Sequence, residues 1–114
     1  MEKLVKGDVV VIPFPFSDLS STKKRPALVL TKLQGDDLIL CQITSKHTKD
    51  KYAIPLSEKE LNSGLLKQES NIRPNKIFTA DVSIIDYKLG SINQMKTKKI
   101  IQKVCKIISS WDLQ

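Results

Sequence analysis

Two arginines and a Thr-Ser pair are the residues of this 114-residue sequence whose types and positions could support chemistry. Arg25 lies at the start of one apolar stretch, Thr44 and Ser45 lie at the end of the next, and Arg73 enters a later one. If the first two stretches pair as strands, Arg25 and the Thr-Ser pair lie at one edge of a small sheet and face the same ligand. The two arginines stand among 19 basic residues that are otherwise lysines, and a planar fork suits a phosphate or a buried carboxylate.

Phosphodiester chemistry fits this set of side chains. A guanidinium can hold two non-bridging oxygens, and hydroxyl or backbone N–H donors can stabilise charge that grows on phosphorus. RNA brings its own nucleophile, the 2′-OH, although arginine is a poor general base because its pKa is above about 12. A purely structural alternative, in which Arg25 pairs with a carboxylate such as Asp18 and Thr44 satisfies a strand end, is equally consistent with the residues alone.

Other chemistries have little support in the sequence. The single histidine, His47, lies in a predicted loop, no acids fall at metal-ligand spacing, and the four glycines are isolated. Cys41 and Cys105 are expected to be small buried hydrophobes in a reducing compartment. No apolar run approaches the roughly 18 residues of a membrane span and no signal peptide is recognisable, so we expect a cytoplasmic protein without a membrane partner.

The charge of the chain favours polyanionic partners. Nineteen basic residues against 12 acidic ones give a formal charge of +7. Such an excess attracts nucleic acid, because each phosphate that is neutralised releases condensed counterions. Most of the lysines are nevertheless expected to form an ordinary solvated surface.

Short apolar stretches separated by turn signals predict a small β structure. The predicted strands cover residues 9–12, 27–31, 38–43, 52–56 and 70–80. Pro13 and Pro15 are expected to end the pairing of the first strand, with Phe14 and Phe16 folding onto the core. A turn is predicted over residues 86–90.

Two helical segments are predicted. Ser57 and Glu60 fit a capping box for one helical turn, which Gly64 should end. A longer C-terminal helix begins after Asn93, with an apolar stripe expected to pack as core and lysines mostly on its other side. The stripe consists of Ile100, Ile101, Val104, Ile107, Ile108 and Trp111, and the lysines are Lys96, Lys98, Lys99, Lys103 and Lys106. Five or so strands followed by this helix predict a small barrel or strongly bent sheet that the helix closes.

Six blocks of the sequence, in order, resemble the MazF/PemK toxins of type II toxin–antitoxin systems. The blocks are GDVV (7–10), PFPFSDL (13–19), KRPALVL (24–30), QITS (42–45), GLLK (64–67) and SNIRPNKIFT (70–79). The resemblance implies a mainly β, SH3-like barrel with a C-terminal helix, as one domain over residues 1–114 that forms a homodimer. It further implies a sequence-specific endoribonuclease that cuts single-stranded mRNA without a metal or other cofactor, leaving a cyclic phosphate and a 5′-hydroxyl. The expected partners are single-stranded RNA and a cognate antitoxin that blocks the RNA groove, in a complex that binds DNA.

The resemblance also assigns roles to residues. Arg25 matches the catalytic arginine of the family, Thr44 the hydroxyl that helps to stabilise the phosphate, and Arg73 a second arginine proposed as an acid in some members. Some members carry a proposed base two residues after that second arginine, where this chain has Asn75, a neutral amide that cannot take a proton. The residues expected to bind RNA are Phe16, Ser17, Lys23, Lys24, Ser45, Lys46, His47, Asn75 and Lys76.

Two other functions fit the same fold. Related barrels poison DNA gyrase through a C-terminal tail that contains a tryptophan, and Trp111 resembles that tail loosely. A non-catalytic RNA-binding barrel is the other alternative, in which Asn75 marks lost chemistry.

Overall fold

The computed structural model describes residues 3–15, 22–45, 49–64 and 69–111. Its strands are β1 (Asp8–Pro15), β2 (Thr22–Lys32), β3 (Asp37–Thr44), β4 (Ile54–Leu56), β5 (Leu61–Gly64), β6 (Ser70–Asp81) and β7 (Tyr87–Ile92). The helices of these described residues are α1 (Gln94–Ser109) and two short 3-10 turns, η1 (Glu58–Glu60) and η2 (Val82–Ile84).

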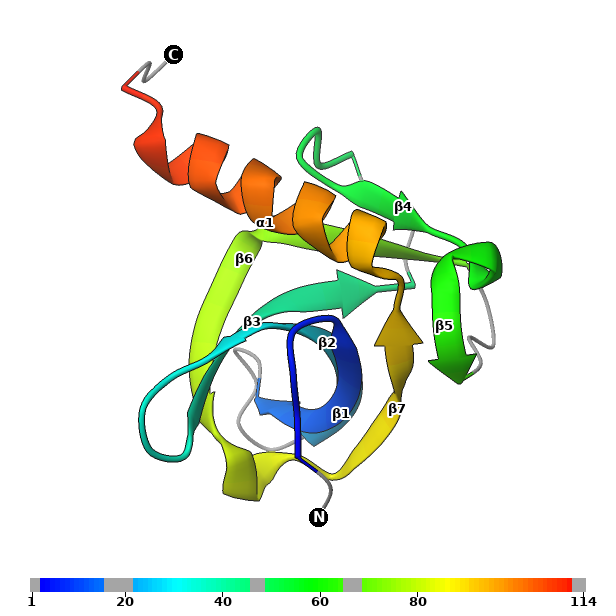
Figure 1. Ribbon diagram of the computed structural model, residues 1–114, viewed down its shortest axis with the longest axis vertical. Helices are drawn as coiled ribbons and strands as arrows, with labels where there is room; N and C mark the ends of the chain where they lie inside the picture. Colours follow the sequence, from blue (N-terminus) through cyan, green and yellow to red (C-terminus); the bar gives the residue numbers. More distant parts are fainter. Residues whose placement is uncertain (1–2, 16–21, 46–48, 65–68, 112–114) are drawn as a thin grey trace.

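Within the described residues the strands form one antiparallel sheet. The strand order is β4-β6-β3-β2-β1-β7-β5, so the long strands β1, β2, β3 and β6 lie together and the shorter strands flank them. Figure 1 shows the sheet curling into a half-barrel, with α1 lying across it. The mainly β, SH3-like barrel with a C-terminal helix that the sequence predicts is therefore confirmed.

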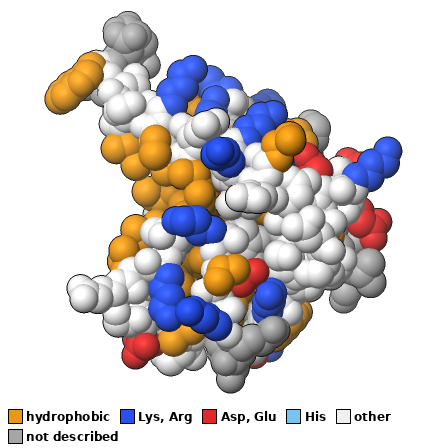
Figure 2. Space-filling model, in the orientation of Figure 1, with side chains coloured by type: hydrophobic (Ala, Val, Ile, Leu, Met, Phe, Trp, Pro, Cys, Tyr) orange, Lys and Arg blue, Asp and Glu red, His pale blue; other side chains and the backbone are white. Residues whose placement is uncertain are grey.

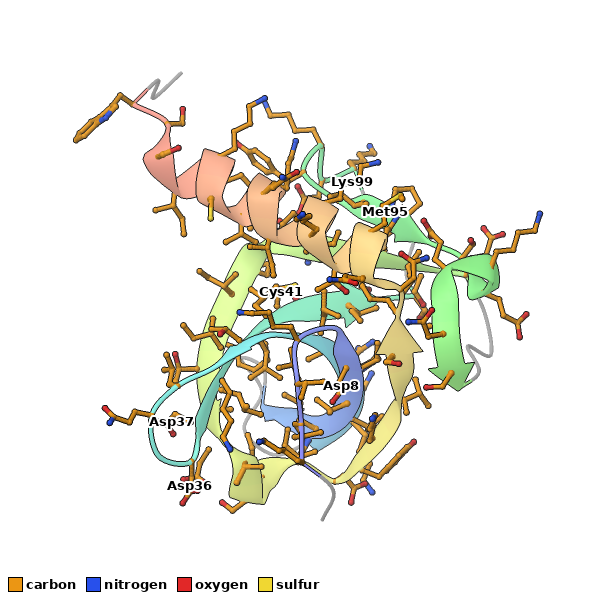
Figure 3. The ribbon with its side chains drawn as sticks, viewed as in Figure 1. Asp8, Asp36, Asp37, Cys41, Met95 and Lys99 are labelled. Atoms are coloured by element: carbon orange, nitrogen blue, oxygen red, sulfur yellow. The ribbon has the colours of Figure 1, made fainter. Side chains whose placement is uncertain are left out.

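The two faces of the sheet carry two separate apolar clusters. Side chains alternate between the faces along each strand, so Leu28 and Cys41 belong to one cluster and Ala27 and Leu40 to the other. Helix α1 covers the first cluster with Ile100, and we call this the helix face; Figure 3 shows Cys41 between β3 and α1. The other side of the sheet is the second face. The buried position of Cys41 confirms the prediction for that cysteine.

Helix α1 begins where the sequence predicts and packs only part of its apolar stripe. The Asn93 side chain caps the helix by accepting a hydrogen bond from the Lys96 N–H at 2.7 Å. The stripe runs past the sheet, so Trp111, expected in the core, is 94% exposed, and Cys105 is exposed as well. Figure 2 shows hydrophobic side chains at this end of the helix. In the described part of the chain no helix is both long and apolar enough to cross a membrane.

Strand β6 contains a bulge of three residues. Its ladder with β3 jumps from the pair Cys41–Ile77 to the pair Gln42–Arg73, which leaves residues 74–76 without opposite partners. The first residue of the bulge is a buried proline, which suits a place where no ladder hydrogen bond is donated. Figure 1 shows β6 turning sharply along its length, as bulges make strands do.

Two boundaries predicted from the sequence are wrong. Strand β1 continues past Pro13 and pairs with β2 as far as Pro15, so the prolines do not end the ladder. Both lie on a strand whose partner β2 continues beside them, and proline can still accept hydrogen bonds. Residues 86–90, expected to form a turn, mostly belong to strand β7. The side chains of Phe14 and Phe16 lie outside the described residues.

Gly64 ends a strand rather than a helix. It has φ of +86° at the end of β5, where it passes Gly90 of β7 so closely that an added Cβ would lie 2.2 Å from the Leu89 carbonyl oxygen. Only glycine tolerates both conditions.

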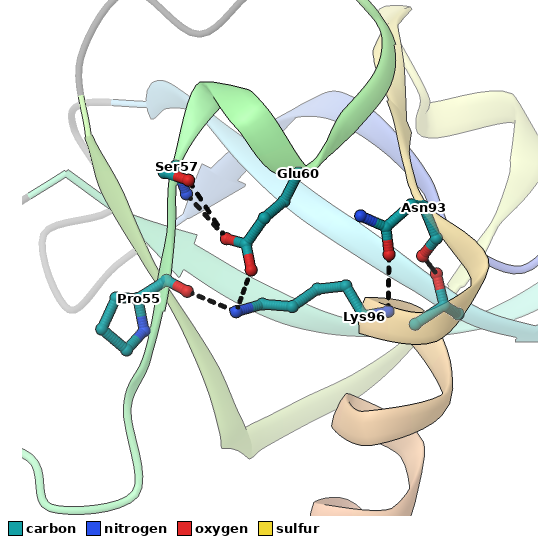
Figure 4. Close-up of polar contacts among 6 residues, drawn as sticks. Pro55, Ser57, Glu60, Asn93 and Lys96 are labelled. Atoms are coloured by element: carbon teal, nitrogen blue, oxygen red, sulfur yellow. Dashed lines mark hydrogen bonds and ion pairs between the residues drawn. The ribbon is translucent and has the colours of Figure 1, made fainter.

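The capping box predicted at Ser57 is confirmed, and it holds a lysine that was expected on the surface. The Ser57 N–H donates to Glu60 at 3.0 Å, while the other carboxylate oxygen of Glu60 lies 2.8 Å from the Lys96 ammonium. Lys96 also donates to the Pro55 carbonyl at 2.8 Å and is buried (Figure 4). This contact ties α1 to the β4–η1 segment.

Candidate active site

Strand register places Arg25, Thr44 and Arg73 on the same face of the sheet. Gln42 of β3 is opposite Ala27 of β2 on one side and opposite Arg73 of β6 on the other. Continuing the β2–β3 register by two residues brings Arg25 opposite Thr44. The register agrees with the prediction that Arg25 and Thr44 lie close together at paired strand ends, and it adds Arg73 to the same face.

These side chains lie at the end of the second face, beyond its apolar cluster. Arg25 is paired with Ile12 of β1 and is half-buried, with its Nε atom buried. Thr44 is 9% exposed and is paired with Asn71 of β6. A guanidinium and a hydroxyl thus lie at the margin of a low-dielectric core, where a hydrogen bond to an anion is stronger than in water.

The guanidinium of Arg73 is held by Asp50. The Nε and Nη2 atoms of Arg73 donate to Oδ2 of Asp50 at 3.2 and 3.1 Å. The side chains are only 23% and 9% exposed, respectively, so this pair is shielded from water much better than an ordinary surface pair. Asp50 follows β3 in the chain, and its other oxygen, Oδ1, accepts from the Tyr52 N–H at 2.9 Å.

The pKa of Asp50 is lowered in this setting. Burial by itself would raise that pKa, but hydrogen bonds from the Tyr52 backbone and from the Arg73 and Asn75 side chains outweigh burial. Asp50 is therefore a carboxylate at neutral pH. A carboxylate that is already satisfied by several donors is a weak proton acceptor.

Asn75 lies in the β6 bulge, close to the same carboxylate. Its side-chain amide donates a hydrogen bond to Asp50, which leaves its own Oδ1 atom as the acceptor. That oxygen is buried and has no hydrogen-bond partner among the described residues. An unsatisfied buried acceptor is unusual and suits a position where a ligand would supply the donor.

The predicted RNA-binding residues in the described chain are divided between the site and the surface. Lys23 and Ser45 are exposed on β2 and at the end of β3, and Lys76 is exposed in the bulge. Lys24 instead forms an ion pair with Asp86 at 2.6 Å, a contact that raises the lysine pKa through the hydrogen bond. The remaining predicted residues lie outside the described ones, namely Phe16, Ser17, Lys46 and His47.

Asp50 and Asn71 belong to the site but were missed in the sequence. Asp50 stands in a polar stretch among lysines, where nothing in the local pattern distinguishes it from a solvated loop acid. Asn71 was seen only as part of a strand. Its pairing with Thr44 could have been inferred from strand register, had the bulge in β6 been known.

The arrangement can bind and stabilise an anion. Two guanidiniums and a hydroxyl share one face, and an amide with an open acceptor stands next to them. Among the described residues, no three His, Cys, Asp or Glu side chains lie close enough to hold a metal ion. The chemistry available from these side chains is electrostatic stabilisation of a phosphate or a similar group.

The fold is a small curled sheet, and its candidate site groups two arginines and a hydroxyl on one face of β2, β3 and β6. Residues 5–108 match the family of PemK-like, MazF-like toxins of type II toxin–antitoxin systems, so the chain belongs to that family. No match is found among curated protein sequences.

Solved structures share the fold at low sequence identity. An endoribonuclease in complex with its cognate antitoxin from a mycobacterial species is 13% identical, with a TM-score of 0.71 over 96% of this chain and 100% of that one. A MazE–MazF structure from Deinococcus radiodurans is 16% identical, with a TM-score of 0.71 over 92% and 95% of the two chains. Mycobacterium tuberculosis toxin MazF-mt6 is 15% identical, with a TM-score of 0.66 over 91% and 99%.

Proposed function

We propose that this protein is the toxin of a type II toxin–antitoxin system and acts as a metal-independent, sequence-specific endoribonuclease on single-stranded RNA. The observation that carries the proposal is the register that aligns Arg25, Thr44 and Arg73 on one face, in a chain of the MazF-like family. The products are a 2′,3′-cyclic phosphate and a 5′-hydroxyl.

In the proposed reaction the 2′ oxygen attacks the adjacent phosphorus while the bond from phosphorus to the 5′ oxygen breaks. The 2′-OH gives up its proton to water, and the departing 5′ oxygen takes one up, so that the protons balance and no net charge is created. Arg25 and the Thr44 hydroxyl donate to the non-bridging oxygens, where charge accumulates in the transition state. Arg73, which Asp50 holds in place, donates a hydrogen bond to the departing 5′ oxygen. This is the position that a general acid occupies in this type of cleavage.

Recognition of the RNA is assigned to the rim of the site. Lys23, Lys24 and Lys76 would contact phosphates, while Ser45 and Asn75 offer hydrogen bonds to base or sugar edges. The remaining predicted contacts, Phe16, Ser17, Lys46 and His47, complete the proposed interface. We further assign the chain a cytoplasmic location, one domain over residues 1–114, a homodimeric state and neutralisation by a cognate antitoxin.

The test is incubation of the purified protein with a long single-stranded RNA in EDTA, followed by mapping of the cut ends. We expect discrete cuts with cyclic phosphate ends, and Arg25→Ala should lower the rate at least about 100-fold while the thermal transition is retained. Lys32→Ala is the matched control, because Lys32 is exposed at the other end of the same strand. Full cleavage by the Arg25 variant would refute the assignment of the site.

One observation favours a second candidate function, poisoning of DNA gyrase. Trp111 is 94% exposed beyond the end of α1, as a tail residue that contacts another protein would be. A gyrase assay that scores trapped DNA cleavage complexes, run with wild type and Trp111→Ala, separates this candidate from the ribonuclease. RNA binding without turnover would instead support a non-catalytic barrel.

A further inference from the structure

Asp50 is the acidic side chain that contacts both polar residues of the β6 bulge region. Its Oδ2 atom accepts two hydrogen bonds from Arg73, and its carboxylate also accepts one from Asn75. The Tyr52 N–H anchors Oδ1 at 2.9 Å, so the carboxylate is fixed from its own segment of chain. Asp50 is 9% exposed, which marks it as part of the packed structure and not as a solvated loop acid.

This contact orients Arg73 without occupying all of its N–H donors. A guanidinium has five N–H groups, and Asp50 takes two of them, both through one carboxylate oxygen. Three N–H groups therefore remain for a ligand. An arginine without such a partner would have to lose its rotamer freedom when substrate binds, and that loss lowers the rate when geometry matters.

We infer that Asp50 is the positioning residue of the site, which sets the Arg73 fork and the Asn75 amide for the phosphodiester. The inference rests on the proposed ribonuclease function and adds to it a residue from outside the strands. It also accounts for the neutral side chain at position 75. The acid of this region stands at position 50, where it acts through the arginine and does not take the proton of the 2′-OH.

The decisive variant is Asp50→Asn, which keeps the size of the side chain. An asparagine whose oxygen still accepts from the Tyr52 N–H must point its NH₂ group at Arg73, so donors face donors and both contacts are lost. We expect kcat to fall about 10- to 100-fold and RNA affinity to fall by a smaller factor, because misplacement of a catalytic group acts mainly in the transition state.

A double-mutant cycle with Arg73→Ala distinguishes positioning from general structural support. If Asp50 acts through Arg73, adding Asp50→Asn to the Arg73 variant should lower kcat by no more than about 2-fold further. Multiplicative effects of the two changes would overturn the inference. So would loss of the acidic limb of the pH–rate profile in Asp50→Asn, which would make Asp50 the general base itself.

Glu60→Gln is the matched structural control. It breaks another partly buried acid–base pair, Glu60–Lys96, neither member of which belongs to the proposed site (Figure 4). We expect this variant to lose thermal stability while its kcat stays within about 2-fold of wild type. A similar fall in kcat in both variants would reduce the role of Asp50 to ordinary support of the fold.

RNA affinity, measured for the same single and double variants of Asp50 and Arg73, tests the inference separately from ribonuclease activity. The probe is the cleaved RNA sequence with 2′-O-methyl groups, or a fixed mixed-sequence RNA if the wild type cuts nothing. In the second case ribonuclease activity fails as a proposal, and non-additive losses of affinity in the Asp50 and Arg73 variants would still support the positioning role. Additive losses, or no binding at all, would overturn it.

Discussion

At the scale of single residues, the site depends on how one carboxylate is shared. Asp50 receives donors from a backbone amide, an arginine and an asparagine, and their sum keeps its pKa low despite burial. The neutral side chain at position 75 is therefore part of the arrangement, since it donates to a carboxylate that is already present.

Asn75→Asp should change the pH dependence of the site. The new carboxylate would stand beside that of Asp50, and two neighbouring carboxylates cannot both ionise easily, so the pair titrates with one apparent pKa above the ordinary value of about 4. We expect the pH–rate profile to gain a limb in that range and the free energy of unfolding at pH 7 to fall by about 1–3 kcal/mol.

The sign of the stability change follows from the raised pKa. A folded-state pKa above the unfolded value penalises the variant at neutral pH, and the penalty disappears as the pH falls below the unfolded pKa. Urea titrations of wild type and Asn75→Asp at pH 4 and pH 7 measure this. Equal differences at the two pH values would show that the carboxylates are not coupled.

Sequence reasoning selected Arg25, Thr44 and Arg73 as candidates because each stands at one end of an apolar stretch, where strand pairing brings polar groups together. It could not find Asp50. The position of that residue depends on the path of the chain between β3 and β4, and no periodic pattern records such a path. The face on which Asn75 lies was likewise hidden in the bulge.

At the scale of elements, α1 is attached to the sheet region by a buried lysine. The Lys96 ammonium, which is 9% exposed, bonds Glu60 and the Pro55 carbonyl, and the first turn of the helix carries this contact. The periodicity of the apolar residues and the pattern of capping residues predicted the helix and the capping box correctly. They placed Lys96 among solvated lysines because lysine is usually exposed, and only tertiary packing overrules that tendency.

Glu60→Gln should remove stability that depends on pH. Burial alone raises the pKa of Glu60, but hydrogen bonds from Lys96 and from the Ser57 backbone lower it overall. The contribution is therefore present above the unfolded value of about 4.3 and is lost as the pH falls through the lowered folded value. We expect a loss of about 1–3 kcal/mol at pH 7 that vanishes at low pH.

Chemical denaturation of wild type and Glu60→Gln between pH 2.5 and pH 7 measures that loss. Glu58→Gln, at an exposed position of the same turn, should change stability by less than about 0.5 kcal/mol and serves as the control. A difference for Glu60→Gln that does not depend on pH would mean that packing, and not charge, joins the two segments.

At the scale of the whole molecule, a charge of +7 favours polyanions in general, and the proposed RNA site would restrict that attraction to one face. Lys23 shares the face of Arg25 two residues away on β2, whereas Lys99 stands on α1 (Figure 3). We expect only the lysines on the same face as the candidate site to contact the phosphates of bound RNA.

Lys23→Gln should reduce the salt dependence of RNA binding, and Lys99→Gln should not. One phosphate contact on a single strand contributes about 0.7 to the slope of log K against log salt concentration. Fluorescence anisotropy with a 2′-O-methyl RNA, from low to high salt, measures both slopes. A reduced slope in Lys99→Gln would place the RNA on the helix.

The architecture as a whole was predictable because alternating apolar stretches and one amphipathic helix leave few ways to bury a core. The exposed end of α1 was not predictable, since periodicity cannot say where the sheet stops covering the helix. Trp111 continues the stripe in sequence but lies beyond the covered turns. The end of β1 was predicted too early for a similar reason. Pairing with β2 compensates for the low strand propensity of Pro13 and Pro15.

The length of the β6 bulge decides to which side of the sheet Arg73 belongs. In an uninterrupted ladder, counting back from Phe78, which packs with the second cluster, puts Arg73 on the helix face. The odd number of extra residues in the bulge reverses this parity and delivers Arg73 to the face of Thr44, with Ile72 turned into the core. Inserting or deleting two residues in the bulge would keep Arg73 on the face of Thr44. Inserting or deleting one residue would turn Arg73 to the helix face and place Ile72 beside Thr44 instead.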